Sequence, residues 1–221
     1  RNVVDVLDFT IARDVIPTYS IDYSDMLSQN IGYIKLSAFN LHSDIEFKDA
    51  LNGLMKKGMK SLIFDLRGNG GGSLEVCIRI LDNFFDSNEL LVYTQGLNRN
   101  RRDYLSSKKG SFKDGKIVVL VDEFSASASE IVAGAIQDHD RGVIIGRRTF
   151  GKGLVQEQIA LKDGSAIRLT VARYYTPLGR SIQRNYERGF KQYYEDLLFR
   201  MENEDLISEE NKDTVKYVTK S

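Results

Sequence analysis

The sequence predicts an α/β domain, on three observations. Short apolar runs typical of strands alternate with amphipathic segments typical of helices. A glycine-rich turn, Arg67 to Gly72, joins one such strand to one such helix. Near the end, two strand-like segments flank the polar turn 162–165, a pattern typical of a β-hairpin.

Composition sets limits on size and partners. The 221 residues suffice for one large domain or two small ones, with a substantial core. The formal net charge is zero, which gives no indication of binding to nucleic acid or to a membrane surface. The single cysteine, Cys77, excludes an internal disulfide and lies in an apolar helical pattern, so we expect it in the core. No apolar run approaches the roughly 20 residues needed to cross a bilayer.

Three parts of the chain are expected. Residues 1–30 form a lead-in, in which Val3–Ile11 alternates loosely like a strand and residues 12–30 resemble a linker. Residues 31–185 form the core. Residues 186–221 form a polar helical tail that continues beyond the end of this chain.

Within the core, the period of the apolar residues predicts the elements in order. Strands are expected at Ile31–Phe39, Ser61–Leu66, Leu90–Gln95, Ile117–Val121, 143–146, Val155–Leu161 and Ala166–Thr176. Helices are expected at Ser43–Lys57, 73–85, 126–138 and 184–202. Ser43 and Glu46 form a capping-box pattern, and the polar stretch 97–115 is expected as a surface loop or hairpin.

Two turns can carry chemistry. Gly68, Gly70, Gly71 and Gly72 follow a buried strand and precede a helix, which leaves backbone N–H groups free to bind an anion or oxyanion. Ser125, Ser127 and Ser129 precede the helix at 126–138. Ser127 with Glu130 matches a capping box, so helix capping alone explains the pattern, but a helix start also stabilises nearby negative charge and so suits a nucleophile.

A nucleophilic serine needs a base. His139 and Asp138 lie about 18 and 16 Å from Ser127 along the same expected helix, too far for direct contact. His42 starts another helix, and nothing in the sequence places it near Ser127. Lys152, bracketed by Gly151 and Gly153 between apolar runs, is the better candidate, provided that it is buried enough to be neutral near pH 7.

One rival motif involves the same lysine. Gly146 to Lys152 matches the G-x-x-x-x-G-K pattern of a phosphate-binding loop. The next residue should be Ser or Thr and a helix should follow, but Gly153 and a strand-like segment follow instead. We therefore expect no nucleotide binding.

Four segments, taken in order, resemble the carboxyl-terminal processing proteases of peptidase family S41. They are GYIKLSAF, DLRGNGGG, SASASE and TFGKGLVQ, and the resemblance covers roughly residues 30 to 185. It implies Ser127 as the nucleophile, Lys152 as the general base and Gln156 as the residue that orients the lysine. It implies an oxyanion hole of the amides of Gly72 and Ala128, with Gly71 as the second choice, and a supporting role for Asp138.

The resemblance also implies a fold and a function. The fold is a crotonase- or ClpP-like ββα spiral core with a C-terminal β-hairpin and a helical tail, and Val3–Ile11 corresponds to the last strand of a PDZ domain that the chain otherwise lacks. We expect a serine endopeptidase that cleaves proteins near an apolar C-terminus without ATP, metal or cofactor. Its partners would be protein or peptide substrates, an adaptor or further copies of itself, but neither nucleic acid nor nucleotide. The protein would be exported and would be either periplasmic or associated with the cell envelope. Two alternatives remain open at this point, an inactive module that binds peptide tails and a crotonase-type acyl-thioester enzyme.

Overall fold

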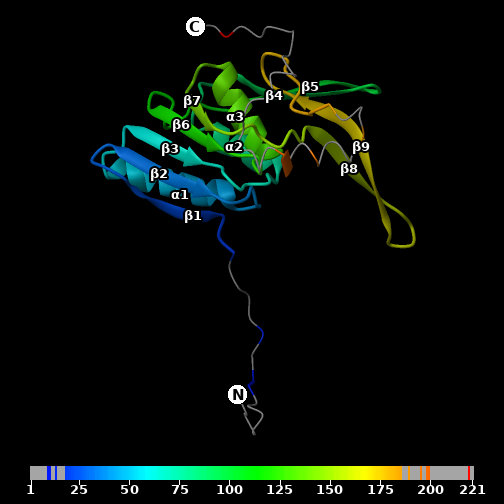
Figure 1. The fold of residues 1–221 in the computed structure, drawn as a ribbon, viewed down its shortest axis with the longest axis horizontal. Coiled ribbons are helices and arrows are strands. Elements are labelled where there is room, and N and C mark those ends of the chain that lie inside the picture. Colours follow the sequence, from blue (N-terminus) through cyan, green and yellow to red (C-terminus); the bar gives the residue numbers. More distant parts are fainter. Residues whose placement is uncertain are drawn as a thin grey trace.

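Two β-sheets and three helices make up the described part of the chain (Figure 1). The structure, a computed structural model, describes residues 18–185 together with 9–10, 13, 189, 195, 198–199 and 219. The strands are β1 (Ile21–Met26), β2 (Ile31–Leu36), β3 (Ser61–Asp65), β4 (Leu90–Gly96), β5 (Arg99–Leu105), β6 (Lys116–Val121), β7 (Val143–Gly146), β8 (Leu154–Ala160) and β9 (Ala166–Tyr175). The helices are α1 (Ser43–Lys56), α2 (Leu74–Leu81) and α3 (Ala128–Asp138).

The first sheet is mostly parallel and positions the candidate site. Its order is β1-β2-β3-β6-β7, and β2, β3, β6 and β7 run parallel to one another. Helix α1 lies between β2 and β3 along the chain, and α3 lies between β6 and β7, so the α/β class is confirmed. Parallel strands end at the same edge of a sheet. The glycine turn after β3 (residues 67–72) and the turn after β6, here called the serine turn (residues 122–127), therefore lie side by side.

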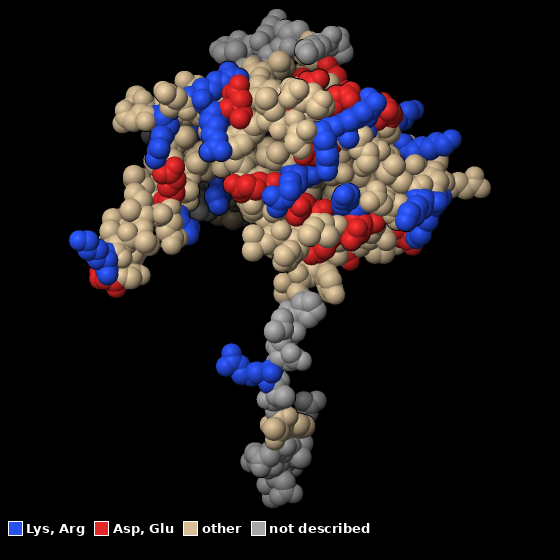
Figure 2. Space-filling view, turned by 180° about the vertical axis from the view of Figure 1, so that it is seen from behind, with Lys and Arg blue, Asp and Glu red and all other residues tan. Residues whose placement is uncertain are grey.

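The second sheet has the order β5-β4-β9-β8 and is antiparallel throughout. Strand β5 lies within the stretch 97–115, which the sequence predicts as a surface loop or hairpin, and it pairs antiparallel with β4. The β8–β9 pair projects as an arm (Figure 1). Figure 2 shows charges of both signs mixed over the body, whereas the arm is mostly uncharged between its base and its charged tip. Its exposed apolar side chains are Ile159, Leu161, Ile167 and Leu169.

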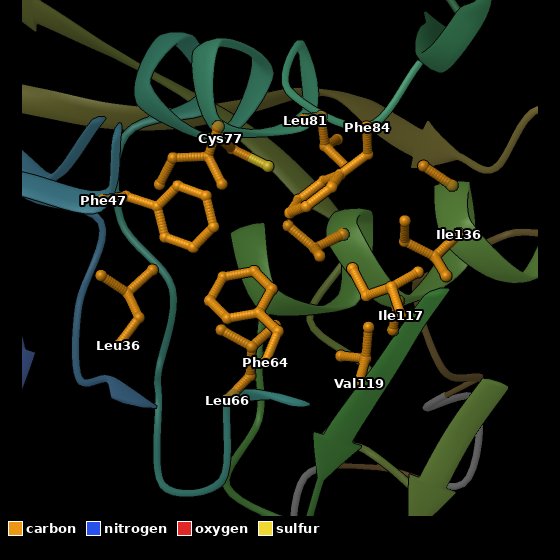
Figure 3. Close-up of a cluster of buried hydrophobic side chains, with 14 of the residues drawn as sticks. Leu36, Phe47, Phe64, Leu66, Cys77, Leu81, Phe84, Ile117, Val119 and Ile136 are labelled. Carbon is orange, nitrogen blue, oxygen red and sulfur yellow. The ribbon is translucent and has the colours of Figure 1, made fainter. Parts of the chain in front are cut away.

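The core between the helices and the first sheet is mostly aliphatic and contains a cluster of phenylalanine rings (Figure 3). Phe47 from α1, Phe64 from β3 and Phe84 after α2 are fully buried, and the ring centroids of Phe47 and Phe64 lie 4.9 Å apart. Cys77 is also fully buried, as predicted, and its thiol lies 3.4 Å from the carbonyl oxygen of Ala128. The apolar faces of α2 and α3 therefore meet directly beneath the serine turn.

Two expectations at the start of the chain are wrong. The linker expected over 12–30 contains β1, an antiparallel edge strand beside β2 whose polar sequence shows no clear period. The capping box expected from Ser43 and Glu46 is absent, because the Glu46 carboxylate instead accepts hydrogen bonds from the amides of Ser20 and Ile21 (2.7 and 3.2 Å). Ser43 Oγ lies 2.6 Å from Ser20 Oγ. Both side chains of the expected cap thus hold the start of β1 against α1.

Two further expectations concern parts that the structure largely leaves undescribed. The strand expected at Val3–Ile11 lies almost entirely outside the described residues. The same holds for the helix expected at 184–202 and for the tail beyond it.

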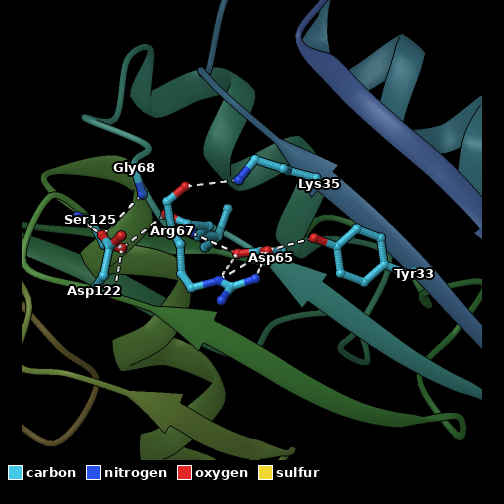
Figure 4. Close-up of polar contacts among 8 residues, drawn as sticks. Tyr33, Lys35, Asp65, Arg67, Gly68, Asp122 and Ser125 are labelled. Atoms are coloured by element: carbon cyan, nitrogen blue, oxygen red, sulfur yellow. Dashed lines mark hydrogen bonds and ion pairs between the residues drawn. The ribbon is translucent and has the colours of Figure 1, made fainter.

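Asp65, the last residue of β3, is fully buried and ionically paired (Figure 4). Its carboxylate accepts hydrogen bonds from Tyr33 Oη (2.6 Å), from Arg67 Nη2 (2.7 Å) and from the Arg67 amide (2.9 Å). Burial alone would raise the pKa of Asp65, but the hydrogen bonds from Arg67 and Tyr33 outweigh it and leave the pKa below its usual value. This carboxylate fixes the direction in which the chain leaves β3 for the glycine turn.

Replacing Tyr33 tests this cluster. Tyr33→Phe removes one hydrogen bond to a buried charge, so we expect the free energy of unfolding at pH 7 to fall by about 1.5–3 kcal/mol. A carboxyl with a lowered folded pKa contributes stability that is present above its unfolded pKa and lost as pH falls through the folded one. The difference between the proteins should therefore be constant above about pH 5 and shrink below about pH 4. Urea unfolding from pH 2.5 to 7 measures it, with Tyr23→Phe on β1 as the exposed control. A difference that does not depend on pH would contradict the role of the Asp65 charge.

Candidate active site

The serine turn after β6 is tied to the glycine turn by side chains at its base (Figure 4). Asp122 Oδ1 accepts hydrogen bonds from the amides of Gly68, Phe124 and Ser125, at 3.0, 3.0 and 3.1 Å. Ser125 Oγ donates to the carbonyl oxygen of Leu66 at 2.9 Å. These contacts lock the two turns together before the chain reaches Ser127.

Ser127 has an unusual backbone. Its φ and ψ are 56° and −110°, a sparsely populated combination for a residue with a side chain. It stands at the sharp turn from β6 into α3, directly before the first residue of the helix. Ser125 and Ser129 are fully buried, whereas Ser127 is half-buried. A strained strand-to-helix turn that presents one hydroxyl at a helix start is the geometry of a nucleophile elbow.

Asn69 binds the glycine turn to its surroundings. The side chain is fully buried, with Nδ2 donating to the carbonyl oxygen of Leu36 (2.9 Å) and Oδ1 accepting from the amide of Gly71 (2.8 Å). Its backbone carbonyl accepts from the amide of Ala126 (3.0 Å) and from Ser129 Oγ (2.9 Å). No sequence pattern distinguished Asn69 as a residue of the site. The only signal was an Asn inside the glycine turn, and Asn is common in turns for local reasons.

Gly71 is the glycine that touches the serine turn. A Cβ on Gly71 would lie 2.7 Å from Ser127 Cβ and 2.9 Å from the Ala128 nitrogen, and its φ is +97°. A Cβ on Gly72 would instead meet the carbonyl oxygen of Phe39 at 2.3 Å. The Gly71 amide donates a hydrogen bond to Asn69 Oδ1. Within residues 18–185, the amides of Gly72 and Ala128 have no protein acceptor. The glycine turn therefore packs against Ser127 at Gly71, and the Ala128 amide follows Ser127 directly at the start of α3.

Glu130 joins the serine turn to residues 151–153, here called the lysine segment. Its carboxylate is 6% exposed and accepts hydrogen bonds from the amides of Ser127 (2.9 Å), Gly151 (2.6 Å) and Lys152 (2.8 Å). Burial raises the pKa of Glu130 against these hydrogen bonds and one from Thr149, which lower it. The capping-box pattern predicted the contact with Ser127, but no sequence pattern indicated the two contacts across to residues 151–152.

Lys152 is not buried as expected. Gly151 and Gly153 on either side are buried, but the Lys152 side chain is exposed. The backbone is fixed on both sides, because Glu130 holds two amides and the Gly153 amide donates to Gln183 Oε1 (3.0 Å). The backbone of Lys152 is therefore held in place by hydrogen bonds, whereas its side chain is exposed to solvent.

The remaining candidate residues lie further out. Gln156 is exposed on β8, where it pairs with Thr170. Asp138, at the end of α3, is 4% exposed and accepts hydrogen bonds from the Leu178 amide (2.9 Å) and from the guanidinium of Arg180, so it anchors the segment after β9.

The two histidines lie elsewhere. His139 Nε2 lies 2.7 Å from the carbonyl oxygen of Leu90. His42 is the N-cap residue of α1. Neither histidine has a described contact with Ser127.

The described residues contain no group of three or more His, Cys, Asp or Glu side chains placed to hold a metal ion. None of the helices formed by these residues has the length and hydrophobicity that a membrane span requires.

Comparison with known proteins supplies the family. Residues 30–192 match peptidase family S41. The chain is 43% identical, over 80% of its length, to a carboxy-terminal-processing protease from Bartonella bacilliformis, of which the match covers 41%. It is 37% identical, over 84% of its length, to the carboxy-terminal processing protease CtpA from Bacillus subtilis, with 39% of that protein covered. The chain thus spans about two fifths of these relatives.

A solved structure agrees in both sequence and fold. The photosystem II D1 C-terminal processing protease is 38% identical, with a TM-score of 0.66 over 69% of this chain and 39% of that one. A putative S41 protease from Bacteroides fragilis, at 18% identity and a TM-score of 0.65, shares the fold. With the family match, the sequence identity and the geometry around Ser127 in agreement, the chain belongs to peptidase family S41.

Proposed function

We propose that this chain is the catalytic core of a serine endopeptidase that cleaves proteins near their C-terminus. The observation that carries the proposal is the strained, half-buried Ser127 at the start of α3, with the glycine turn packed against it at Gly71. In this mechanism Ser127 Oγ attacks the scissile carbonyl while Lys152 Nζ accepts its proton. Lys152 then returns the proton to the leaving amine, and water, deprotonated by the same amine, releases the acyl-enzyme.

The oxyanion is held by backbone donors. The Ala128 amide is the first of α3, where the helix dipole adds to its effect, and the Gly72 amide is the second donor. Loss of one such donor typically costs about 3 kcal/mol of transition-state stabilisation. Gly71 donates no hydrogen bond to the oxyanion in this proposal. It contributes because the absence of its Cβ allows the glycine turn to approach Ser127.

The lysine must move inward to act. Its amide and that of Ser127 bind the same oxygen, Glu130 Oε2, so the two backbones are separated by no more than two hydrogen-bond lengths. The flexible stem can therefore carry the amine to the serine, and an occupied substrate site would exclude the water around it. Gln156, four residues beyond Lys152, is the proposed residue that orients the amine. Asp138 supports the site indirectly, through the segment after β9.

The wider setting is part of the same proposal and rests on the family. The substrates are proteins or peptides with apolar C-termini, the setting is periplasmic or associated with the cell envelope, and an adaptor or homo-oligomer regulates access. A crotonase-like ββα spiral is the proposed description of the parallel sheet with its intervening helices. ATP and metal play no part in the proposed steps.

The first test concerns the nucleophile. Ser127→Ala should abolish both the cleavage of an unfolded protein with an apolar C-terminus and the labelling of the chain by a fluorophosphonate. Ser125→Ala and Ser129→Ala each remove a buried hydrogen bond and should cost about 1–3 kcal/mol of stability, yet retain labelling at Ser127. Mass spectrometry locates the adduct. Label on Ser129 would overturn the assignment, and no label in the folded wild type would favour a peptide-binding module or an acyl-thioester enzyme.

The second test concerns the base. Lys152→Ala and Lys152→Arg should both inactivate, because a guanidinium cannot accept a proton at usable pH. Lys162→Ala, in the exposed β8–β9 turn, should leave peptide turnover unchanged. Turnover by Lys152→Arg close to that of the wild type, in a protein shown to be folded, would remove the lysine from the mechanism.

The third test uses two neighbouring glycines. Gly71→Ala places a Cβ against Ser127 and Ala128, so we expect kcat to fall on the order of 100-fold, as when an oxyanion donor is lost. Gly70→Ala is the matched control, because nothing lies within 4 Å of its Cβ position. Equal kcat values for the two variants would show that contact between the turns does not shape the site.

A further inference from the structure

We propose that Glu130 is a positioning residue that sets the spacing between the nucleophile and the base. This role rests on the proposed function, since it concerns Ser127 and Lys152 as reacting groups. Glu130 touches neither reacting atom. It acts through the backbone of both residues, from the first turn of α3.

The contacts cross between distant parts of the chain. Glu130 Oε2 accepts from the amides of Ser127 and Lys152, and Oε1 accepts from the amide of Gly151. A capping residue of α3 requires only the contact with Ser127. The other two contacts contribute nothing to the helix cap, and they hold the lysine segment at the same carboxylate.

The arrangement requires a carboxylate. Three N–H donors converge on two oxygens, and an ionised carboxylate offers acceptors only. In Glu130→Gln, the side chain keeps its size but has one oxygen, and its NH₂ group must face at least one of the three amides. The group is 6% exposed, so water cannot readily replace the lost acceptor.

The spacing of the reacting groups depends on these bonds. The φ of 56° at Ser127 persists only if the surroundings over-determine it, and Glu130 holds the amide of that residue. The Lys152 side chain is exposed, so the position of its stem follows from the backbone that Glu130 holds. A displacement of about 1 Å between reacting groups can cost on the order of 100-fold in rate.

The main experiment compares two buried glutamates. In Glu130→Gln, kcat and the rate of fluorophosphonate labelling at Ser127 should fall about 100-fold, while KM changes little. Glu123→Gln is the matched control, because Glu123 is also 6% exposed and its carboxylate accepts hydrogen bonds from the guanidinium of Arg147, directly after β7. It should lose stability but keep its rate. Equal rate losses in both variants would indicate a general structural effect and overturn the proposal.

A double-mutant cycle separates positioning from general support. If Glu130 acts by aligning the lysine with the serine, adding Glu130→Gln to Lys152→Ala should change the labelling rate at Ser127 by less than about 5-fold. A purely structural Glu130 would reduce labelling by the same factor in both backgrounds, which would overturn the proposal.

Amide hydrogen exchange gives a readout that needs no activity. In the wild type the amides of Ser127, Gly151 and Lys152 should be protected, and Glu130→Gln should expose these three while core amides of β3 stay protected. Unchanged protection, or a labelled Glu130→Gln that reacts at the wild-type rate, would overturn the Glu130 role alone. A folded wild type that is not labelled at Ser127 would overturn the proposed function and this role with it.

Discussion

The buried amide of Asn69 is the interaction on which the geometry of the site depends. The side-chain amide donates to the carbonyl oxygen of Leu36 at the end of β2 and accepts from the amide of Gly71. The backbone carbonyl of Asn69 accepts from the Ala126 amide in the serine turn and from Ser129 Oγ at the start of α3. A buried amide without partners is costly, so the side chain of Asn69 is stable in this position only with both of its partners. Three strand ends of the parallel sheet are thereby fixed relative to one another.

The two proposed reacting residues differ in how firmly they are held. Ser127 lies between the Asn69 contacts on one side and Glu130 on the other, and its backbone can adopt only the strained conformation that both allow. Lys152 is held at its backbone, and its side chain is exposed. The proposed site therefore combines a firmly held nucleophile with a base on a flexible stem, a division that suits the proposed polypeptide substrate.

Local patterns predicted the parallel strands, the three helices and the serine turn, because burial imposes a period and turns require particular residues. They missed β1, a polar edge strand, and misassigned Glu46, because its partner amides lie 25 and 26 residues away. They also led to the expectation that Lys152 is buried, whereas its side chain is exposed. Such errors share one cause. Whether a side chain is covered depends on packing between segments that no local period records.

The backbone of Ser127 has a consequence for the evolution of such a chain. A non-glycine residue at this φ costs on the order of 1–3 kcal/mol, and glycine would relieve most of that strain. Selection for thermal resistance alone would thus drive this position toward glycine and delete the hydroxyl. Under the proposed mechanism, a sequence in this fold with glycine there would be more stable but inactive, so thermal stability and turnover are opposed at a single position.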